Sequence, residues 1–479
     1  MATKHTFGDD IFFATISELS AKLRTKEFSA TELTRAFADR LETLGPRFNA
    51  LACSLKDSAI KKAKDLDGDI KRDRWRPLQG IPFAVKDLLA VHGNPTTWGA
   101  KPYAGQVFKE DATVVKKLEK AGGILIGKLA MVELAGGPSY RYASASLTGP
   151  GLNPWDRTRW TGGSSSGSGA AVAAGLSTFA IGSETSGSIL TPAAYCGVTG
   201  LRPTYGLVSR HGAMALSWTM DKLGPMCRSA EDCGLVLSAI AGADPLDPGS
   251  AGKSFYFAPQ FRRAAKDIVV GYASADFDEW PEASARDAFQ KAFETVKAEG
   301  YQMKDVKLPS FPYSAITSTV IGAEAASIFE ELITSGKVDE LADKRQIANL
   351  KAALDIPAKE YLKAMRLRTQ IQAEFRELLA GIDVLFAPAR YNVATPIRDP
   401  LDKSPFGDRP TPQRTGLNGL IPAGNLAGLP AISVPCGFAN GMPVGIQFCS
   451  RPFSENIIIG VAAAYQKQTD WHRRRPPIG

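Results

Sequence analysis

Gly162-Gly-Ser-Ser-Ser-Gly-Ser-Gly-Ala-Ala171 is the first of two runs rich in glycine and serine that best indicate the fold of this 479-residue chain. The second, Gly182-Ser-Glu-Thr-Ser-Gly-Ser-Ile189, follows after one apolar segment. Each run is typical of a tight turn that leads into a helix, because glycine allows backbone conformations that other residues resist. We expect a helix at 170–175, a strand at 178–182 and a further helix that begins near Ser188.

The same alternation of strand and helix extends outward from these turns. Upstream, the apolar run Gly80-Ile-Pro-Phe-Ala-Val-Lys-Asp87 predicts a buried strand that ends at Lys86, and a helix at 112–121 precedes a strand at 124–126. Downstream we expect a helix at 229–241 and strands at 383–386, 431–434 and 443–447. This pattern favours an α/β fold with a mixed β-sheet and helices on its faces.

We interpret residues 1–479 as one domain. Residues 10–70 read as helices, with a capping box at Ser29-Ala-Thr-Glu32. The sheet core is expected from 70–245 and 383–450. The segment 250–382 carries longer helical patterns and more charge, and we expect it to be a more variable, helix-rich region that shapes a substrate pocket.

Composition excludes several classes of protein. The net charge is only +8 and is dispersed, apart from three consecutive arginines at 473–475 that read as a solvated tail, so we expect no nucleic-acid partner. No apolar stretch is long enough to span a bilayer, and the N-terminus lacks the apolar core of a secretory signal. Six cysteines without a Cys-x-x-Cys motif indicate reduced, buried thiols rather than a metal site. We therefore expect a cytoplasmic protein.

Three short motifs have simpler explanations. Gly122 to Leu129 nearly fits a phosphate-binding loop but lacks its final Ser or Thr. The run 163–167 fits Gly-x-Ser-x-Gly, yet that hydrolase pattern needs a histidine base, and none of the four histidines has an obvious acidic partner. Ser58-Ala-Ile-Lys61 fits Ser-x-x-Lys but lies in a polar helix, where a solvated surface is the better interpretation.

Lys86 and the two serine turns form the strongest candidate site. A serine hydroxyl needs a base before it can attack a carbonyl group, and a neutral lysine can serve where histidine is scarce. Burial disfavours the ammonium form and can lower the pKa of a lysine by up to about 3–5 units. Backbone N–H groups at the start of a helix suit a developing oxyanion.

These residues lie in blocks that resemble the amidase signature family over nearly the whole chain. The matching blocks are 80–87, Asn153-Pro-Trp-Asp, Gly162-Gly-Ser-Ser165, 182–189, Pro192-Ala-Ala-Tyr-Cys-Gly197, Gly200-Leu-Arg-Pro-Thr204, Leu223-Gly-Pro225, 425–431 and Gly441-Met-Pro-Val-Gly-Ile-Gln447. The resemblance implies a large twisted mixed sheet flanked by helices, with a helical insertion at the substrate pocket.

The resemblance also implies a Ser–cis-Ser–Lys triad. Ser188 matches the nucleophile that forms an acyl-enzyme, Ser164 the bridging serine after a cis peptide bond, and Lys86 the base. The implied oxyanion hole consists of the backbone N–H groups of Thr185, Ser186, Gly187 and Ser188. Neither a metal nor an organic cofactor is expected.

The chain departs from the family around the nucleophile, where many members have Asp-Thr-Gly-Gly-Ser-Ile-Arg. Here the run is Glu184-Thr-Ser-Gly-Ser-Ile-Leu190. Ser186 restricts a backbone position that is commonly glycine, and Leu190 removes a positive charge near the site. Because the three triad side chains are retained, we still expect catalysis; the two departures leave the local geometry and the substrate preference open.

The leading hypothesis is a hydrolase of small-molecule carboxylic amides, with esters or carbamates as further substrates. The alternative is the glutaminase (A) subunit of a tRNA-dependent amidotransferase; members of that type carry an Asp where this chain has Asn418, and a neutral amide is a weaker anchor for an ammonium group. We expect Met131, Ala135 and Tyr140 to contribute to the substrate pocket, together with parts of 310–420. The sequence leaves open which amide is the substrate and whether the chain forms a homo-oligomer.

Overall fold

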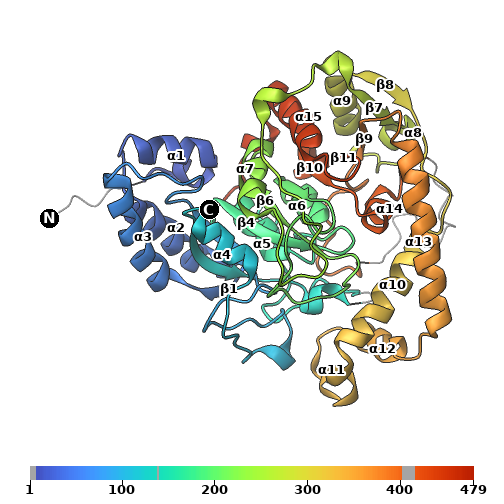
Figure 1. Ribbon diagram of the computed structural model, residues 1–479, viewed down its shortest axis with the longest axis horizontal. Helices are drawn as coiled ribbons and strands as arrows, with labels where there is room; N and C mark the ends of the chain where they lie inside the picture. The colour runs from blue at the N-terminus through green and yellow to red at the C-terminus, as the bar shows by residue number, and fades with distance from the viewer. Residues whose placement is uncertain (1–6, 138–139, 402–415, 479) are drawn as a thin grey trace.

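The computed structural model describes residues 7–137, 140–401 and 416–478, and its strands form one mixed sheet of eleven strands (Figure 1). The order across the sheet is β1-β3-β2-β4-β6-β5-β10-β11-β9-β7-β8. The strands are β1 (Leu51–Ser54), β2 (Pro82–Lys86), β3 (Ile124–Leu129), β4 (Phe179–Glu184), β5 (Thr199–Arg202), β6 (Lys222–Cys227), β7 (Val269–Tyr272), β8 (Gln302–Asp305), β9 (Val384–Pro388), β10 (Ala431–Ala439) and β11 (Met442–Cys449). The expected mixed α/β sheet is therefore confirmed.

Strand β2 lies between β3 and β4 and is parallel to both. All three strands are buried along their whole length, as expected for parallel strands that are covered on both faces. Phe83 of β2 is in register with Phe179 of β4, and their rings stack with centroids 5.3 Å apart. This packing fixes the carboxyl end of β2, where Lys86 lies.

Helices lie on both faces of the sheet. On β5, the position of a Cβ on Gly200 is 2.7 Å from Ala193 of α6, whereas the Thr199 hydroxyl accepts a hydrogen bond from Gln466 of α15. Successive strand residues point to opposite faces, so α6 and α15 cover different faces. The α-helices are α1 (Ile16–Arg24), α2 (Ala30–Leu44), α3 (Lys56–Lys71), α4 (Thr113–Lys120), α5 (Ser166–Ala173), α6 (Leu190–Cys196), α7 (Ala230–Ile240), α8 (Ala275–Asp278), α9 (Arg286–Ala298), α10 (Tyr313–Ile328), α11 (Glu330–Thr334), α12 (Lys344–Ala353), α13 (Ala358–Leu378), α14 (Leu420–Ala427) and α15 (Glu455–Gln468).

The sheet is wider than the blocks 70–245 and 383–450 that we expected. Strand β1 precedes residue 70 and pairs with β3, and the segment 250–382 supplies β7 and β8, which are parallel to each other. The sequence signal is weak because β7 and β8 have four residues each and β8 is a largely exposed edge strand. The rest of that segment is helical, and α10 to α13 form a layer beside α14 (Figure 1).

Several element boundaries differ from the sequence expectation. Helix α5 begins at Ser166, four residues before the expected start, so most of the first serine-rich run is helical. Strands β10 and β11 form a hairpin longer than either expected strand. Its turn contains Asn440 and Gly441, both with positive φ, which is the Asn-Gly signal of a two-residue hairpin turn. The capping box of Ser29 and Glu32 at the start of α2 is confirmed.

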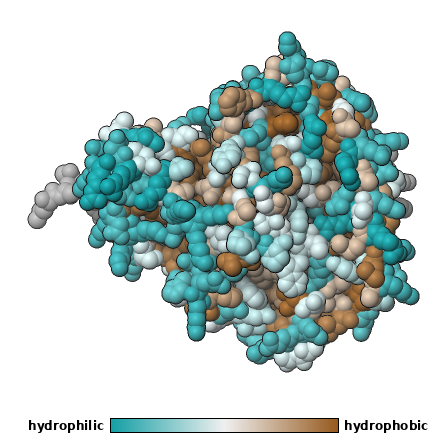
Figure 2. Space-filling model, viewed as in Figure 1, coloured by the Kyte–Doolittle hydropathy of each residue, from teal (hydrophilic) through white to brown (hydrophobic). Residues whose placement is uncertain are grey.

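The surface seen in Figure 2 is mostly hydrophilic, with hydrophobic residues scattered among polar ones. Among the described residues, none of the helices combines the length and apolar character that crossing a bilayer requires. Five of the six cysteines are buried, and all six are free thiols. The arginines of the expected solvated tail are exposed but paired, since Arg475 contacts Asp10 at 2.6 Å and Arg474 contacts Asp470 at 2.9 Å.

The aromatic cluster under β9 gives a test of the fold. Phe386 is fully buried, with its ring centroid 4.7 Å from Phe277 and 5.2 Å from Phe448. We expect Phe386→Ala to lower the free energy of unfolding by about 3–5 kcal/mol, because truncation leaves a cavity where three elements meet. Phe261, which is 80% exposed, provides the matched control: Phe261→Ala should change stability by less than about 0.5 kcal/mol. Equal denaturant midpoints for the two variants would contradict this packing.

Candidate active site

The Lys86 side chain is completely buried at the carboxyl end of β2. Its Nζ lies 2.7 Å from Ser164 Oγ and 2.8 Å from Ser183 Oγ. Ser164 belongs to the loop before α5, and Ser183 lies on β4 beside β2. The amine therefore joins the two serine-rich runs that the sequence singled out.

Burial lowers the pKa of Lys86 to about 7, although the nearby carboxylates of Asp221 and Glu184 act in the opposite direction. A large fraction of this amine is then neutral near pH 7 and can accept a proton. In solution the pKa of a lysine is about 10.4, so an exposed amine would be charged at the same pH.

The turn that carries Ser188 is anchored by Glu184. The Glu184 carboxylate accepts hydrogen bonds from the backbone N–H groups of Ile189 at 2.9 Å and Leu190 at 3.0 Å. It also pairs with Arg202 at 2.9 Å and accepts from Asn425 at 2.8 Å. Burial raises the pKa of Glu184, but these partners hold it below its usual value. The carboxylate thus stays ionised and fixes the turn.

The expected oxyanion residues lie in this turn. Thr185 is held by its hydroxyl, which donates to Asp221 at 2.6 Å, and Gly187 has a φ of 95°. Ser186 does not adopt a positive φ, so serine replaces glycine there without backbone strain. Ser188 is partly exposed, and its carbonyl accepts from the N–H of Ser165 at 3.4 Å, which links the two turns. Among the described residues its hydroxyl has no hydrogen-bond partner.

The loop that leads to Ser164 is closely packed. The peptide bond between Gly163 and Ser164 is cis. A Cβ on Gly163 would lie 2.7 Å from the Trp160 ring, 2.8 Å from Val132 and 3.0 Å from the Tyr140 hydroxyl, so no larger residue fits. The Ser164 carbonyl accepts from the N–H of Val132 at 3.1 Å.

The three expected pocket residues occupy different surroundings. Tyr140 lies beside Gly163, and Ala135 lines a cavity next to Ser183. Met131 is fully buried and packs against Gly99, so its side chain lines neither of the cavities described below. Residues 138–139 and 402–415 of the expected pocket regions lie outside the described residues.

Ala135 has an unusual backbone position. It lies in the short turn Glu133–Gly136 and has a φ of 55°, which non-glycine residues rarely adopt. The turn is held by the buried Glu133 carboxylate, which accepts from the N–H groups of Ala342 at 2.9 Å and Asp343 at 3.0 Å. The helix-rich segment therefore positions a wall of the site.

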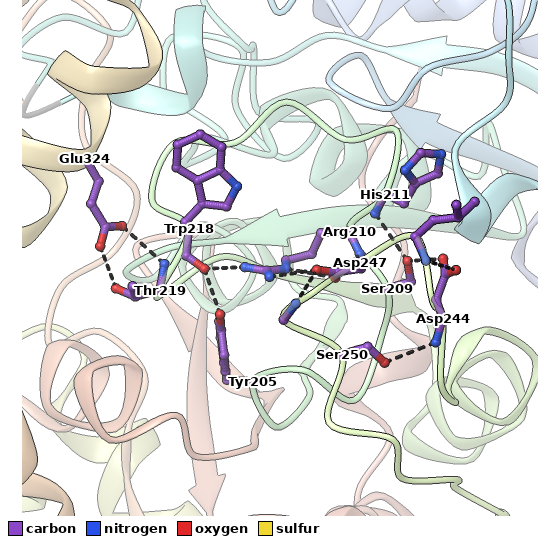
Figure 3. Close-up of polar contacts among 12 residues, drawn as sticks. Tyr205, Ser209, Arg210, His211, Trp218, Thr219, Asp244, Asp247, Ser250 and Glu324 are labelled. Atoms are coloured by element: carbon purple, nitrogen blue, oxygen red, sulfur yellow. Dashed lines mark hydrogen bonds and ion pairs between the residues drawn. The ribbon is translucent and has the colours of Figure 1, made fainter.

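The cavity beside Ser183 has a volume of about 220 Å³. Thr185 and Asp221 line it on the sheet side, and Arg210 and Trp218 form part of its rim. Arg210 pairs with Asp247 at 3.0 Å and donates to the Trp218 carbonyl, which also accepts from Tyr205 at 2.7 Å (Figure 3). These contacts connect Arg210 and Trp218 to Asp247 and to Tyr205.

A second cavity, of about 600 Å³, is lined by residues of α14 and by residues that follow β9. Ile421 of α14 lines it, and its Cγ2 methyl is 3.1 Å from the position of a Cβ on Gly187. Asn418 and Arg390 also line this cavity.

Sequence reasoning missed Ser183, Asp221 and the buried Lys222. Asp221 and Lys222 directly precede the block Leu223-Gly-Pro225, and two charged residues at the start of a buried strand are a signal that could have been used. Lys222 faces Glu184 across the antiparallel pair of β4 and β6, and its Nζ has no hydrogen-bond partner among the described residues. Burial lowers the pKa of Lys222 well below its usual value.

No cluster of three or more His, Cys, Asp or Glu side chains suited to a metal ion occurs within 7–137, 140–401 and 416–478. The polar groups that converge on the site are the amine of Lys86, serine hydroxyls and backbone N–H groups. This set is suited to attack on a carbonyl group and to stabilisation of an oxyanion.

Known proteins are similar to this chain in sequence and in fold over nearly its whole length. The chain is 36% identical over 493 residues to the A subunit of glutamyl-tRNA(Gln) amidotransferase from Synechococcus, a match that covers 97% of this chain and 94% of the relative. The native peptide amidase from Stenotrophomonas maltophilia superposes with a TM-score of 0.81 at 28% identity, covering 97% of this chain and 98% of the amidase. The A subunit of glutamyl-tRNA(Gln) amidotransferase from Thermotoga maritima superposes with a TM-score of 0.79 at 28% identity, covering 98% of this chain and 99% of the relative.

The family model described as Amidase matches residues 32–459, which include β2, both serine-rich turns and α14. The chain therefore belongs to the amidase signature family of enzymes.

Proposed function

We propose that this protein hydrolyses carboxylic amides through an acyl-enzyme formed on Ser188. The observation that carries the proposal is the buried amine of Lys86, which lies within hydrogen-bond distance of Ser164 and has a pKa of about 7. A neutral amine in this position is a base for a serine hydroxyl.

Proton transfer follows the two serines. Ser188 Oγ attacks the carbonyl carbon, and its proton passes through Ser164 to Lys86 Nζ. The contact between Lys86 and Ser164 is already formed. The contact between Ser164 and Ser188 forms when substrate orders the partly exposed Ser188, since catalytic hydrogen bonds often tighten only in the complex.

Collapse of the tetrahedral intermediate completes acylation. Its oxyanion is stabilised by the backbone N–H groups of Thr185 to Ser188, which the Glu184 carboxylate and Asp221 hold in place from both ends of the turn. The C–N bond breaks, and the amine leaves with the proton that Lys86 returns through Ser164. Water then attacks the acyl carbon, and its proton passes through Ser164 to Lys86. The ester bond to Ser188 Oγ breaks, the proton returns through Ser164 to that oxygen, and the carboxylic acid leaves.

The second candidate function is release of ammonia from glutamine, as in the glutaminase component of an amidotransferase. It is supported by the names of the curated relatives, which cover nearly the whole chain. Asn418, which lines the larger cavity, supplies a neutral amide where the resemblance implies a carboxylate for the glutamine amine. Glutamine-specific turnover, or co-purification with two further subunits from the native source, would favour this candidate over a stand-alone amidase.

Replacement of the nucleophile tests the proposal directly. We expect Ser188→Ala to lower kcat for amide hydrolysis by at least about a thousandfold, because no acyl-enzyme can form. Ser58→Ala is the control, since it removes a serine hydroxyl from an exposed position of α3. Rates are measured on a panel of anilides, and equal activity of Ser188→Ala and wild type would refute the assignment.

The pH dependence tests the base. Because Lys86 must be neutral to accept a proton, kcat/KM should rise with pH through an apparent pKa of about 7 and fall about tenfold per pH unit below it. Asp221 raises the pKa of Lys86, so Asp221→Asn should move the acidic limb to lower pH. Asp355→Asn, at an exposed position after α12, should leave the profile unchanged. A profile without an acidic limb between about pH 6 and 8 would contradict the role of Lys86.

A further inference from the structure

The cavity of about 600 Å³ is lined by residues that follow β9 and by residues of α14. One of its walls adjoins the turn that carries Ser188, because a methyl group of Ile421 lies against Gly187. Arg390, two residues after the end of β9, also lines this cavity.

Arg390 is an exposed cation at the side of this cavity. Among the described residues it has neither a hydrogen-bond partner nor an ion-pair partner. It lies near enough to Tyr140 to act on that phenol: burial raises the pKa of Tyr140, and Arg390 opposes the effect. The Tyr140 hydroxyl is in turn 3.0 Å from the position of a Cβ on Gly163, directly before Ser164. Arg390 thus lies near Tyr140, and Tyr140 adjoins the residue before Ser164.

Other charged groups of the cavity come from the connection between α8 and α9. Glu282 accepts from the Ser284 hydroxyl at 2.9 Å and from the N–H of Val393 at 3.4 Å, so the protein already uses its carboxylate. Glu279 is exposed at the end of α8. Arg286 lies at the start of α9, where its buried Nε has no hydrogen-bond partner among the described residues, whereas Arg390 is exposed.

We propose that Arg390 binds a carboxylate on the acyl part of the substrate, so that the preferred substrates are amides with a negative charge remote from the scissile bond. The inference rests on the proposed amide hydrolysis and specifies its substrate class. A guanidinium presents paired N–H donors that match a carboxylate, and charge-assisted pairs of this kind are among the stronger polar contacts. An arginine at the side of a cavity, without a partner among the described residues, is available for that contact.

The test compares three series of primary amides of increasing chain length: monoamides of linear dicarboxylic acids, uncharged alkanamides, and amides with a terminal amino group. We expect the wild type to prefer the carboxylate series at its best length by about 10- to 100-fold in kcat/KM, the range of one charged hydrogen bond. The preference should reside mainly in KM, because the contact is far from the reacting bond, and should weaken with added salt.

Substitutions of Arg390 test whether the preference for carboxylates depends on this residue. Arg390→Gln should abolish the preference for carboxylates and leave the turnover of uncharged amides unchanged, and Arg390→Lys should retain part of the preference. Arg366→Gln removes the same charge from an exposed position of α13 and should behave as wild type. A wild type that prefers the uncharged or the amino series, or an Arg390→Gln variant with an unchanged preference, would overturn the proposal.

The outcomes separate this inference from the proposed function. Turnover of uncharged amides that disappears in Ser188→Ala upholds the hydrolase whatever the charge preference is. Absence of turnover on every amide in all three series would remove both proposals.

Discussion

The hydrogen bond between the buried amine of Lys86 and the Ser164 hydroxyl is the interaction on which the rest of the site depends. An amine at the end of an exposed strand would keep its proton at neutral pH. Here β2 is enclosed between β3 and β4, and the stacked rings of Phe83 and Phe179 close the layer beneath it. Burial in the sheet therefore favours the neutral form of the Lys86 amine, which is the form that the proposed mechanism requires of a base.

Glu184 and Lys86 have different parts at the site: the Glu184 carboxylate holds the turn in place, and in the proposed mechanism the neutral amine of Lys86 is the base. Glu184 is buried but ionised, because Arg202, Asn425 and two backbone N–H groups satisfy it. A buried carboxylate with this many partners fixes the nucleophile turn without competing for the proton of Lys86. The family members named as a peptide amidase and as an amidotransferase subunit share the fold at TM-scores of 0.81 and 0.79.

The sequence was sufficient for the mixed sheet, the capping box of α2, and the meeting of Lys86 with the first serine-rich turn, since these follow from apolar runs, glycine placement and the family blocks. It was not sufficient for β7 and β8, because each strand has only four residues and β8 is polar and largely exposed. Ser183 escaped notice because its role depends on the register of β4 against β2. Arg390 was not identified from the sequence, because a single arginine in a loop belongs to no sequence motif. Only the fold brings Arg390 near Tyr140.

A direct titration of the Lys86 amine tests whether it is neutral near pH 7, as the proposed mechanism requires. The chain has two further buried lysines, Lys128 and Lys222, whose pKa values are also lowered by burial, so the three must be separated. An NMR titration of protein with isotope-labelled lysine side chains measures each pKa without reference to any substrate. The signals are assigned from Lys86→Arg, Lys128→Arg and Lys222→Arg. We expect a midpoint of about 7 for the signal lost in Lys86→Arg. A midpoint near the ordinary lysine value of about 10.4 would contradict it.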